Sequence, residues 1–406
     1  MGNRNLEKQS NIRVPYSMSV HGEEEIDACL QVLRTTTQMG KNVAEFEAAI
    51  AERFCKKIGI FVNSGSSALF LSVEAMNLPA GSHVLTPALT FATTVGSIIK
   101  HDLIPVFVDV EIDTFNIDAD KVESMITNDC RAMSIPNLMG NLPDWEKLRE
   151  IAVKHDLQII EDSADILGAK YKGENMGRYS DISTCSFYGN HVINCAGNGG
   201  IICTNDKKLA EKIRLLRSWG RSSTIITDSE SIDSRFDVDV DAVPYDAKFV
   251  FEEIGYNLEG SELGAAFGLI QNKRLSSFLS RRKEITSAHT EYFGQHKGWL
   301  DLPRLNKDAD TVWFAYPLIV REDAPFSRQD VQIFLEKRNI QTRPIFTGNI
   351  IRQPGFRHIR KVVDPEGYPN SDRVMERGFL IGAHHGMTSD MVEYVHDTFT
   401  EFANQF

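Results

Sequence analysis

The sequence has few cysteines, and none of them forms a Cys-x-x-Cys pair. The 406-residue chain has six: Cys29, Cys55, Cys130, Cys185, Cys195 and Cys203. Most of them lie in apolar stretches, which is typical of reduced, buried thiols in a cytosolic protein. We therefore expect neither a disulfide framework nor a bound metal.

Long hydrophobic runs and blocks of basic residues are also missing. No run approaches the roughly 20 apolar residues of a membrane span, and the opening residues MGNRNLEKQSNIRV lack the apolar core of a signal peptide. The net charge is -12 and no Lys/Arg block stands out, which argues against nucleic acid and anionic membranes as partners. These absences favour a cytoplasmic protein that binds no nucleic acid and no membrane.

Short apolar runs alternate with helical segments between about residues 22 and 270. The runs are rich in β-branched residues, which predicts strands buried on both faces of a sheet. They cover residues 58–62, 83–86, 104–108, 132–135, 158–160, 184–187 and 200–203. Helical segments, such as 22–33 and 43–54, separate most of them. This alternation predicts an α/β fold with a mostly parallel central sheet.

Two regions depart from that alternation. Residues 222–247 are acidic and rich in Ser and Asp, which predicts a long loop or insertion. The chain after about residue 275 predicts a smaller α+β domain, with a helix at 275–293, a strand at 311–320, and helices at 328–338 and 392–402. The predicted organisation is an N-terminal arm (1–21), a large α/β domain (22–274) and a smaller C-terminal domain (275–406).

Polar clusters follow several predicted strands, and they are candidates for a ligand site. They occupy residues 63–67, 87–91, 161–163 and 188–191. In sheets of this kind, ligands bind at the carboxyl ends of the strands. The coincidence of polar clusters with strand ends therefore predicts one shared site.

Each cluster suggests a chemical role and also has a simpler explanation. Gly65 and Ser66 open a helix and could cradle a phosphate, although a serine N-cap with a glycine turn would look the same. Asp162 could hold a heterocyclic nitrogen protonated, or could merely cap a helix. Phe91 could stack on a ring or pack in the core, and His191 could be an ordinary loop histidine. The order and spacing of the four clusters together favour the functional alternatives.

Together these segments resemble the DegT/DnrJ/EryC1/StrS family, the sugar aminotransferases and dehydratases of the fold-type I PLP-dependent transferases. The similarity spans about residues 12 to 400. It implies that Gly65, Ser66 and Ser186 hold the phosphate of pyridoxal 5′-phosphate (PLP). It further implies that Phe91 stacks on the ring and that Asp162 pairs with its nitrogen. Asn257 would reach the phosphate in the neighbouring subunit, which implies a homodimer with shared active sites.

His191 occupies the position at which most members of that family have their Schiff-base lysine. Asp165 is an acid where the aminotransferases usually have Gln, and the resemblance places it with the cofactor-binding residues. Both features are similar to the branch of NDP-4-keto-6-deoxyhexose 3-dehydratases, which make dideoxysugars such as those of lipopolysaccharide O-antigens. Imidazole forms no stable Schiff base, so the cofactor would bind noncovalently as PLP or pyridoxamine phosphate (PMP). A histidine with a pKa near 6.5 could still act as general base.

The resemblance also indicates how the cofactor would be renewed and where the substrate would bind. In the CDP-sugar dehydratase of the family, a cysteine-rich stretch that carries an iron–sulfur cluster follows Trp-Gly-Arg. Here the residues after Arg221 are Ser-Ser-Thr, which favours the route in which L-glutamate restores the amine. Arg221, Arg343 and Arg352 are candidates for the diphosphate of a nucleotide sugar, with surface ion pairs as the alternative.

Three alternatives to the dehydratase remain open at this point. The chain could act by the same elimination on another keto or nucleoside substrate, or it could be a sugar aminotransferase with an unusual base. It could also be an inactive subunit that binds a cofactor or nucleotide. The presence of Asp162, Asp165, Ser186 and Asn257 argues against the last of these.

Overall fold

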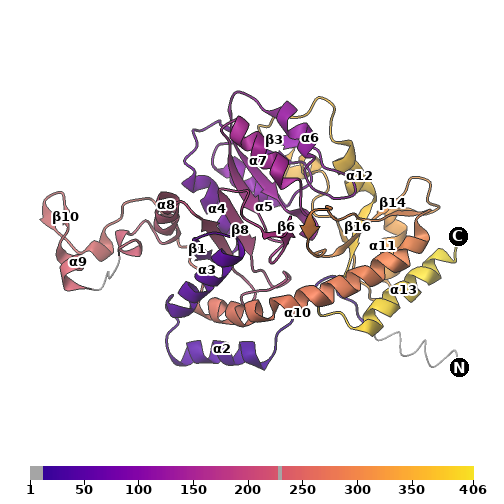
Figure 1. Cartoon of the computed structure of the whole chain (residues 1–406), viewed down its shortest axis with the longest axis horizontal. Coiled ribbons are helices and arrows are strands. Elements are labelled where there is room, and N and C mark those ends of the chain that lie inside the picture. Colours follow the sequence, from indigo (N-terminus) through magenta and orange to yellow (C-terminus); the bar gives the residue numbers. More distant parts are fainter. Residues whose placement is uncertain (1–11, 227–230) are drawn as a thin grey trace.

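The computed structural model describes residues 12–226 and 231–406, and a mixed sheet lies at its centre (Figure 1). In the described residues this sheet has the strand order β1-β9-β8-β5-β4-β2-β3. The strands are β1 (Ile58–Val62), β2 (His83–Pro87), β3 (Ile104–Val108), β4 (Cys130–Pro136), β5 (Gln158–Asp162), β8 (Ile182–Ser186) and β9 (Gly200–Thr204). Strand β9 runs antiparallel to β1 and β8, and the other neighbouring strands of the sheet pair in parallel. The predicted strands and the mostly parallel α/β fold are confirmed.

Helices cover both faces of this sheet, which explains why its strands are apolar throughout. They include α3 (Lys41–Arg53), α4 (Gly65–Ala75), α5 (Ala92–Lys100), α6 (Ala119–Val122), α7 (Trp145–Lys154) and α8 (Lys207–Arg217). Along β1, Ile60 belongs to the core cluster on the side of α4 and α8. The next residue, Phe61, points to the other side and meets Phe46 of α3 with ring centroids 5.2 Å apart. Successive residues of a strand face opposite sides, so both must be apolar here.

The C-terminal part of the chain contains a second sheet and its own core cluster. Its strands are β12 (Leu300–Asp301), β14 (Tyr316–Val320), β15 (Arg343–Pro344) and β16 (Gly378–Ile381), and its helices are α11 (Arg328–Glu336), α12 (Pro369–Arg377) and α13 (Ser389–Ala403). Short strands β6 (Lys170–Tyr171), β7 (Glu174–Asn175) and β13 (Ala309–Asp310) form a third sheet.

Two predicted boundaries in this half are wrong. The helix expected from residue 275 is α10 (Glu262–Phe293), which begins 13 residues earlier at the N-cap Ser261. The strand expected over residues 311–320 begins only at residue 316. The residues before it bond to the other half of the molecule instead, since Phe314 N donates to Met139 O at 2.8 Å. The domain division at residue 274 stays a prediction, and α10 runs through it.

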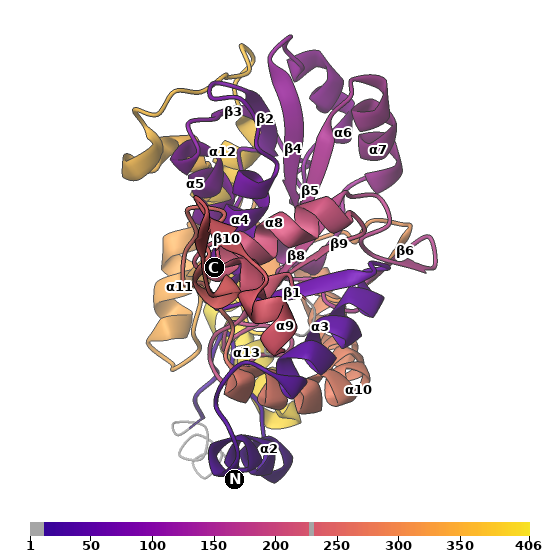
Figure 2. The same ribbon diagram turned by 90° about the vertical axis from the view of Figure 1, so that its left-hand side faces the viewer.

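The segment predicted as a long loop at 222–247 contains short regular elements where it is described. They are α9 (Ile232–Phe236), β10 (Asp239–Val240) and β11 (Val243–Pro244), and residues 227–230 lie outside the described part. Arg235 pairs with Asp246 at 2.5 Å and helps to fold the segment upon itself. The segment projects from the left side of the body in Figure 1 and faces the viewer in Figure 2. The described part of the segment is thus not wholly irregular, and its assignment as a long loop or insertion stays a prediction.

The N-terminal part packs beneath the long helix. Helix α2 (Glu23–Arg34) lies along α10 (Figure 1), and the buried Glu25 accepts a hydrogen bond from Arg274 at 2.9 Å. Of the predicted arm 1–21, residues 12–21 are described, and Val14 forms a parallel bridge with Ile340. Within the described residues, we find no helix with the length and apolar character that crossing a bilayer requires.

Buried histidines join α10 to α13. His289 is fully buried; its Nε2 lies 3.0 Å from Gly382 O and its Nδ1 lies 3.0 Å from His396 Nε2. Burial lowers the pKa of His289 to about 3 and that of His396 to about 4. In the unfolded chain these groups would titrate near 6.5. Below that pH the unfolded state therefore binds more protons, and stability is lost as the pH falls.

We expect the free energy of unfolding to fall by about 2 kcal/mol between pH 7 and pH 5 from His289 alone. Urea denaturation at the two pH values measures it. The change His289→Gln should flatten this dependence, because glutamine does not titrate, whereas His358→Gln at an exposed position should leave it unchanged. Equal pH dependence in the native protein and in His289→Gln would contradict the prediction.

Candidate active site

A cavity of about 210 Å³ opens at the carboxyl ends of the central strands. Pro136, Asp162 and Ser186, the last residues of β4, β5 and β8, all line it. Tyr16 from the N-terminal segment and Phe314 from the C-terminal half also line it. The structure thus brings the four polar clusters together at one place.

The N-terminus of α4 forms one end of this cavity. Ser64 is the N-cap and accepts the N–H of Ser67 at 3.1 Å. Gly65 and Ser66 occupy the first turn, where N–H groups have no acceptor within the helix and can bind an anion. A Cβ on Gly65 would lie 2.6 Å from the Cβ of Ser186, so only glycine leaves this space open.

Asp162 lies at the end of β5 with few hydrogen bonds for a buried carboxylate. Its Oδ2 accepts the hydroxyl of Thr94 at 3.0 Å, and its Oδ1 accepts the N–H of Ala164 at 3.3 Å. Burial raises the pKa of this carboxyl above its usual value. A cationic ring nitrogen in the cavity would compensate the charge of the carboxylate.

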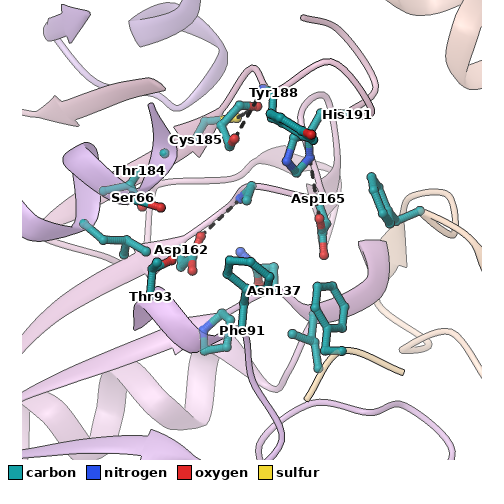
Figure 3. A pocket seen from close by; sticks show the side chains of 18 of the residues that line it. Ser66, Phe91, Thr93, Asn137, Asp162, Asp165, Thr184, Cys185, Tyr188 and His191 are labelled. Carbon is teal, nitrogen blue, oxygen red and sulfur yellow. Dashed lines mark hydrogen bonds and ion pairs between the residues drawn. The ribbon is translucent and has the colours of Figure 1, made fainter. Parts of the chain in front are cut away.

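His191 and Asp165 face each other across the same cavity (Figure 3). His191 Nδ1 lies 3.6 Å from Asp165 Oδ1, and Asp165 Oδ2 accepts the N–H of Met139 at 3.1 Å. Burial and the neighbouring Asp162 raise the pKa of Asp165 to about 7. Burial and the positive charge of Arg282 lower the pKa of His191 to about 4. The imidazole is therefore uncharged at neutral pH and available to accept a proton.

The other predicted residues lie at different distances from the cavity. Phe91 lines it and is about half exposed. The guanidinium of Arg343 lies 5.3 Å from the ring of Tyr16, a cavity residue. Arg352 pairs with Asp372 and Glu376, which is the alternative role considered for it. Arg221 lies outside the cavity and stacks on Trp219 at 4.6 Å. Asn257, also outside, forms an isolated bridge with Ser218.

Sequence reasoning missed several residues of the site. Thr94 could have been found, because it lies in the first turn of the helix that follows Phe91. Asn137 lines the cavity and donates to Ser163 Oγ at 3.0 Å, but no motif marks it. Tyr16 and Phe314 are far from the other site residues in sequence, so only the fold reveals them. Among the described residues that line the cavity, none is a lysine.

The fold is that of the PLP-dependent aminotransferase class. Residues 19–400 match the DegT/DnrJ/EryC1/StrS aminotransferase family, and the chain belongs to this family. The resemblance deduced from the sequence is thereby confirmed.

Individual relatives are named as sugar dehydratases or as proteins of lipopolysaccharide synthesis. The chain is 35% identical over 377 residues to dTDP-4-dehydro-2,6-dideoxy-D-glucose 3-dehydratase of Saccharopolyspora spinosa, with 89% of this chain and 80% of that protein covered. It is 36% identical over 370 residues to the lipopolysaccharide biosynthesis protein RfbH of Salmonella typhimurium, with 86% and 84% covered.

The solved structures that match include a dehydratase with its cofactor. E. coli GDP-4-keto-6-deoxy-D-mannose-3-dehydratase with bound hydrated PLP superposes with a TM-score of 0.87 at 25% identity, covering 95% of this chain and 99% of that one. Another structure of a GDP-4-keto-6-deoxymannose-3-dehydratase, which holds a trapped PLP–glutamate geminal diamine, gives the same TM-score, identity and coverage.

We expect the carboxyl group of Asp165 to titrate near pH 7 in the ligand-free protein, because it is buried beside Asp162. Infrared difference spectra recorded between pH 5 and 9 should show a protonated carboxyl band that disappears near neutrality. The change Asp165→Asn should remove this transition, while Asp156→Asn at an exposed position should retain it. A carboxyl signal already lost below pH 5 would refute the prediction.

Proposed function

We propose that this protein is a PLP/PMP-dependent dehydratase that removes the C3 hydroxyl of an NDP-4-keto-6-deoxyhexose. The observation that carries the proposal is the pairing of His191 with Asp165 in a cavity whose described lining has no lysine. Relatives named as sugar 3-dehydratases support the substrate class. The product would be a 3-deoxy sugar for dideoxysugar synthesis, such as that of lipopolysaccharide O-antigens.

The residues of the cavity fit the cofactor. Gly65 and Ser66 offer N–H groups at the start of α4, and Ser186 adds a hydroxyl next to Gly65. These groups would hold the phosphate. Asp162 would accept the hydrogen of the protonated ring nitrogen, and Phe91 would cover the ring. The noncovalent PLP or PMP would be retained by these contacts alone.

The reaction then follows from what these side chains can do. Bound in its amine form, the cofactor supplies an amino group for the sugar ketone and an electron-withdrawing ring. Asp162 keeps the ring nitrogen protonated. His191, uncharged at neutral pH, would act as general base and accept the proton from C4′ of the bound cofactor. With no lysine at hand to re-form a covalent link, elimination of the C3 hydroxyl as water is favoured over amino transfer.

The partners in this proposal are a nucleotide sugar and L-glutamate as amine donor. Arg343 lies beside the cavity residue Tyr16 and is the best placed of the three predicted arginines for a diphosphate. Arg221 and Arg352 remain candidates, although Arg352 already pairs with two carboxylates. A trapped PLP–glutamate adduct in a related dehydratase supports glutamate as donor.

A homodimer with shared active sites is part of the same proposal. Large apolar side chains are exposed on the projecting segment, among them Ile232, Phe236, Val243 and Tyr245. Asn257 lies near its base and outside its own cavity, as a residue that serves a neighbouring subunit would. A cytoplasmic location agrees with the six cysteines, all of which are unpaired thiols.

The main alternative is a sugar aminotransferase, and a change of substrate within the same elimination chemistry is another. GDP-perosamine synthase of Caulobacter vibrioides is 31% identical over 324 residues. The described cavity lining has no lysine, which favours the dehydratase over the aminotransferase. The lack of a lysine does not show which keto or nucleoside substrate such an elimination would use.

We expect the purified protein, supplied with PLP, glutamate and a GDP-, CDP- or dTDP-4-keto-6-deoxyhexose, to release ammonia and a 3-deoxy sugar. Mass spectrometry of the product and an ammonia assay measure both. The change His191→Asn should lower turnover by about 100-fold or more, because it removes the base. The change His358→Gln serves as the control. An aminated sugar as product would support the aminotransferase instead, and consumption of none of the sugars would refute the proposed substrate class.

The change His191→Lys should trap the cofactor covalently. An amine placed at this position can bond to PLP, whereas imidazole cannot. After borohydride reduction, the mass of the variant should rise by one reduced cofactor, and the native protein should remain unmodified. An adduct on the native protein would mean that another lysine serves the site, and the proposal would fail.

A further inference from the structure

The N-terminal segment that precedes α2 contributes Tyr16 to the cavity lining and pairs with the C-terminal half of the chain. Val14 N donates to Asn339 O and Gln341 N donates to Val14 O, both at 2.9 Å, which is parallel strand pairing. Tyr16 N then donates to Oε1 of the Gln341 side chain at 3.2 Å, and the pairing ends. Tyr16 therefore lies beside the chain that continues into β15, whose first residue is Arg343.

Further contacts hold this segment along its length. His384 Nε2 lies 3.0 Å from Pro15 O. Ser19 Oγ accepts a hydrogen bond from the amide of Asn194 at 3.1 Å, and Asn194 belongs to the loop that carries His191. The segment is thus bound to both halves of the molecule, and the part of the cavity lining that it supplies belongs to the folded structure.

The ring of Tyr16 contacts both a second lining residue and an arginine. It packs edge-to-face against Phe314, with ring centroids 6.5 Å apart and an angle of 67° between the rings. The guanidinium carbon of Arg343 lies over the ring of Tyr16, 5.3 Å from its centroid. This separation is within the range of a cation–π interaction. Tyr16 thus connects the cavity to a guanidinium that does not itself line it.

Most hydrogen-bond donors of Arg343 remain free for a ligand. Within the described residues its guanidinium makes one hydrogen bond, from Nη1 to Thr342 O at 2.6 Å. The carboxylate that pairs with it, that of Glu336, lies 3.8 Å away, and about half of the arginine side chain is exposed. A guanidinium has five N–H donors. Arg352, by contrast, already donates to the carboxylate of Asp372.

We propose that Tyr16 is a positioning residue for the substrate: its ring holds Arg343 beside the cavity, where the guanidinium binds the diphosphate of a nucleotide sugar. The inference rests on the proposed function, in which the substrate is a nucleotide sugar. An aromatic ring suits this task, because stacking on a guanidinium neither neutralises its charge nor uses its N–H groups. A carboxylate in the same place would do both, and the planar fork could no longer grip two phosphate oxygens.

Calorimetric titration of the full-length, PLP-loaded protein with GDP, CDP and dTDP tests the inference. We expect the native protein to bind at least one of these nucleotides. The change Tyr16→Leu should weaken that binding about fivefold to tenfold, because it removes the cation–π contact. Tyr16→Phe keeps the ring and should stay within about twofold of the native affinity. Arg343→Gln should cost at least as much as Tyr16→Leu, and the double variant should bind no more weakly than Arg343→Gln.

The matched control is Phe334→Leu. Phe334 holds Arg338 in the same kind of contact, with the guanidinium carbon 3.5 Å from the ring centroid, and neither residue lines the cavity. Loss of this contact should leave nucleotide affinity unchanged. It therefore separates an effect of Arg343 from a general effect of removing an aromatic ring.

Arginine side-chain NMR of the native protein is a second measurement, and it needs no change at Tyr16. The Nε–H signal of Arg343 can be assigned by its absence from Arg343→Gln, a change at an exposed position. Addition of the nucleotide that binds should shift this signal, because the guanidinium then contacts the diphosphate. The result decides the matter even if Tyr16→Leu does not fold.

Any of the following would overturn the inference: no binding of the three nucleotides, unchanged affinity in Tyr16→Leu, an equal loss in Tyr16→Phe or in Phe334→Leu, or an Arg343 signal that binding does not move. None of these measurements needs turnover of a sugar. Affinity lost in Tyr16→Leu together with no dehydration of any sugar would uphold the inference and refute only the proposed function. Dehydration by the native protein with unchanged affinity in Tyr16→Leu would do the reverse.

Discussion

Burial of carboxylates at the end of β5 is the constraint on which the site depends. Glu161 is compensated within the protein: it accepts bonds from Ser163, Ser180 and the N–H of Gly177. Asp162, the next residue, has only Thr94 and one backbone N–H. A desolvated carboxylate with spare acceptor capacity is costly unless a cation arrives. Glu161 therefore has a structural role at the strand end, whereas Asp162 keeps acceptor capacity for a ligand.

Much of the fold could be predicted from the sequence, because buried parallel strands leave a local signal. All seven runs of apolar residues became strands of the central sheet. The boundaries that failed depended on long-range contacts: residues 311–315 have strand-like composition, but Phe314 bonds to Met139 in the other half of the molecule. No local pattern contains that information. The start of α10 was missed as well. The first turns after the N-cap Ser261 are rich in Gly and Ala, so they carry little apolar pattern.

The candidate site divides in the same way. The residues that follow strands, such as Gly65, Asp162 and His191, could be located because each strand end has a polar cluster. The residues that arrive from elsewhere could not: Tyr16 reaches the cavity because Val14 bridges to Ile340, and Arg282, on α10, lowers the pKa of His191 from outside the cavity lining. Their positions follow from packing between distant segments. The electrostatics of His191 are therefore a property of the whole fold and not of its own loop.

The absence of a lysine from the described cavity lining also affects how the protein would retain its cofactor. A covalent tether makes occupancy independent of supply, whereas a ligand held by hydrogen bonds and packing obeys mass action. The fraction of protein with bound cofactor would then rise and fall with the concentration of free PLP in the cell. Each cofactor molecule could leave after a turnover and be replaced by another. PLP would then act as an exchangeable cosubstrate. A shortage of free PLP would lower the activity of this protein before that of family members that hold the cofactor on a lysine.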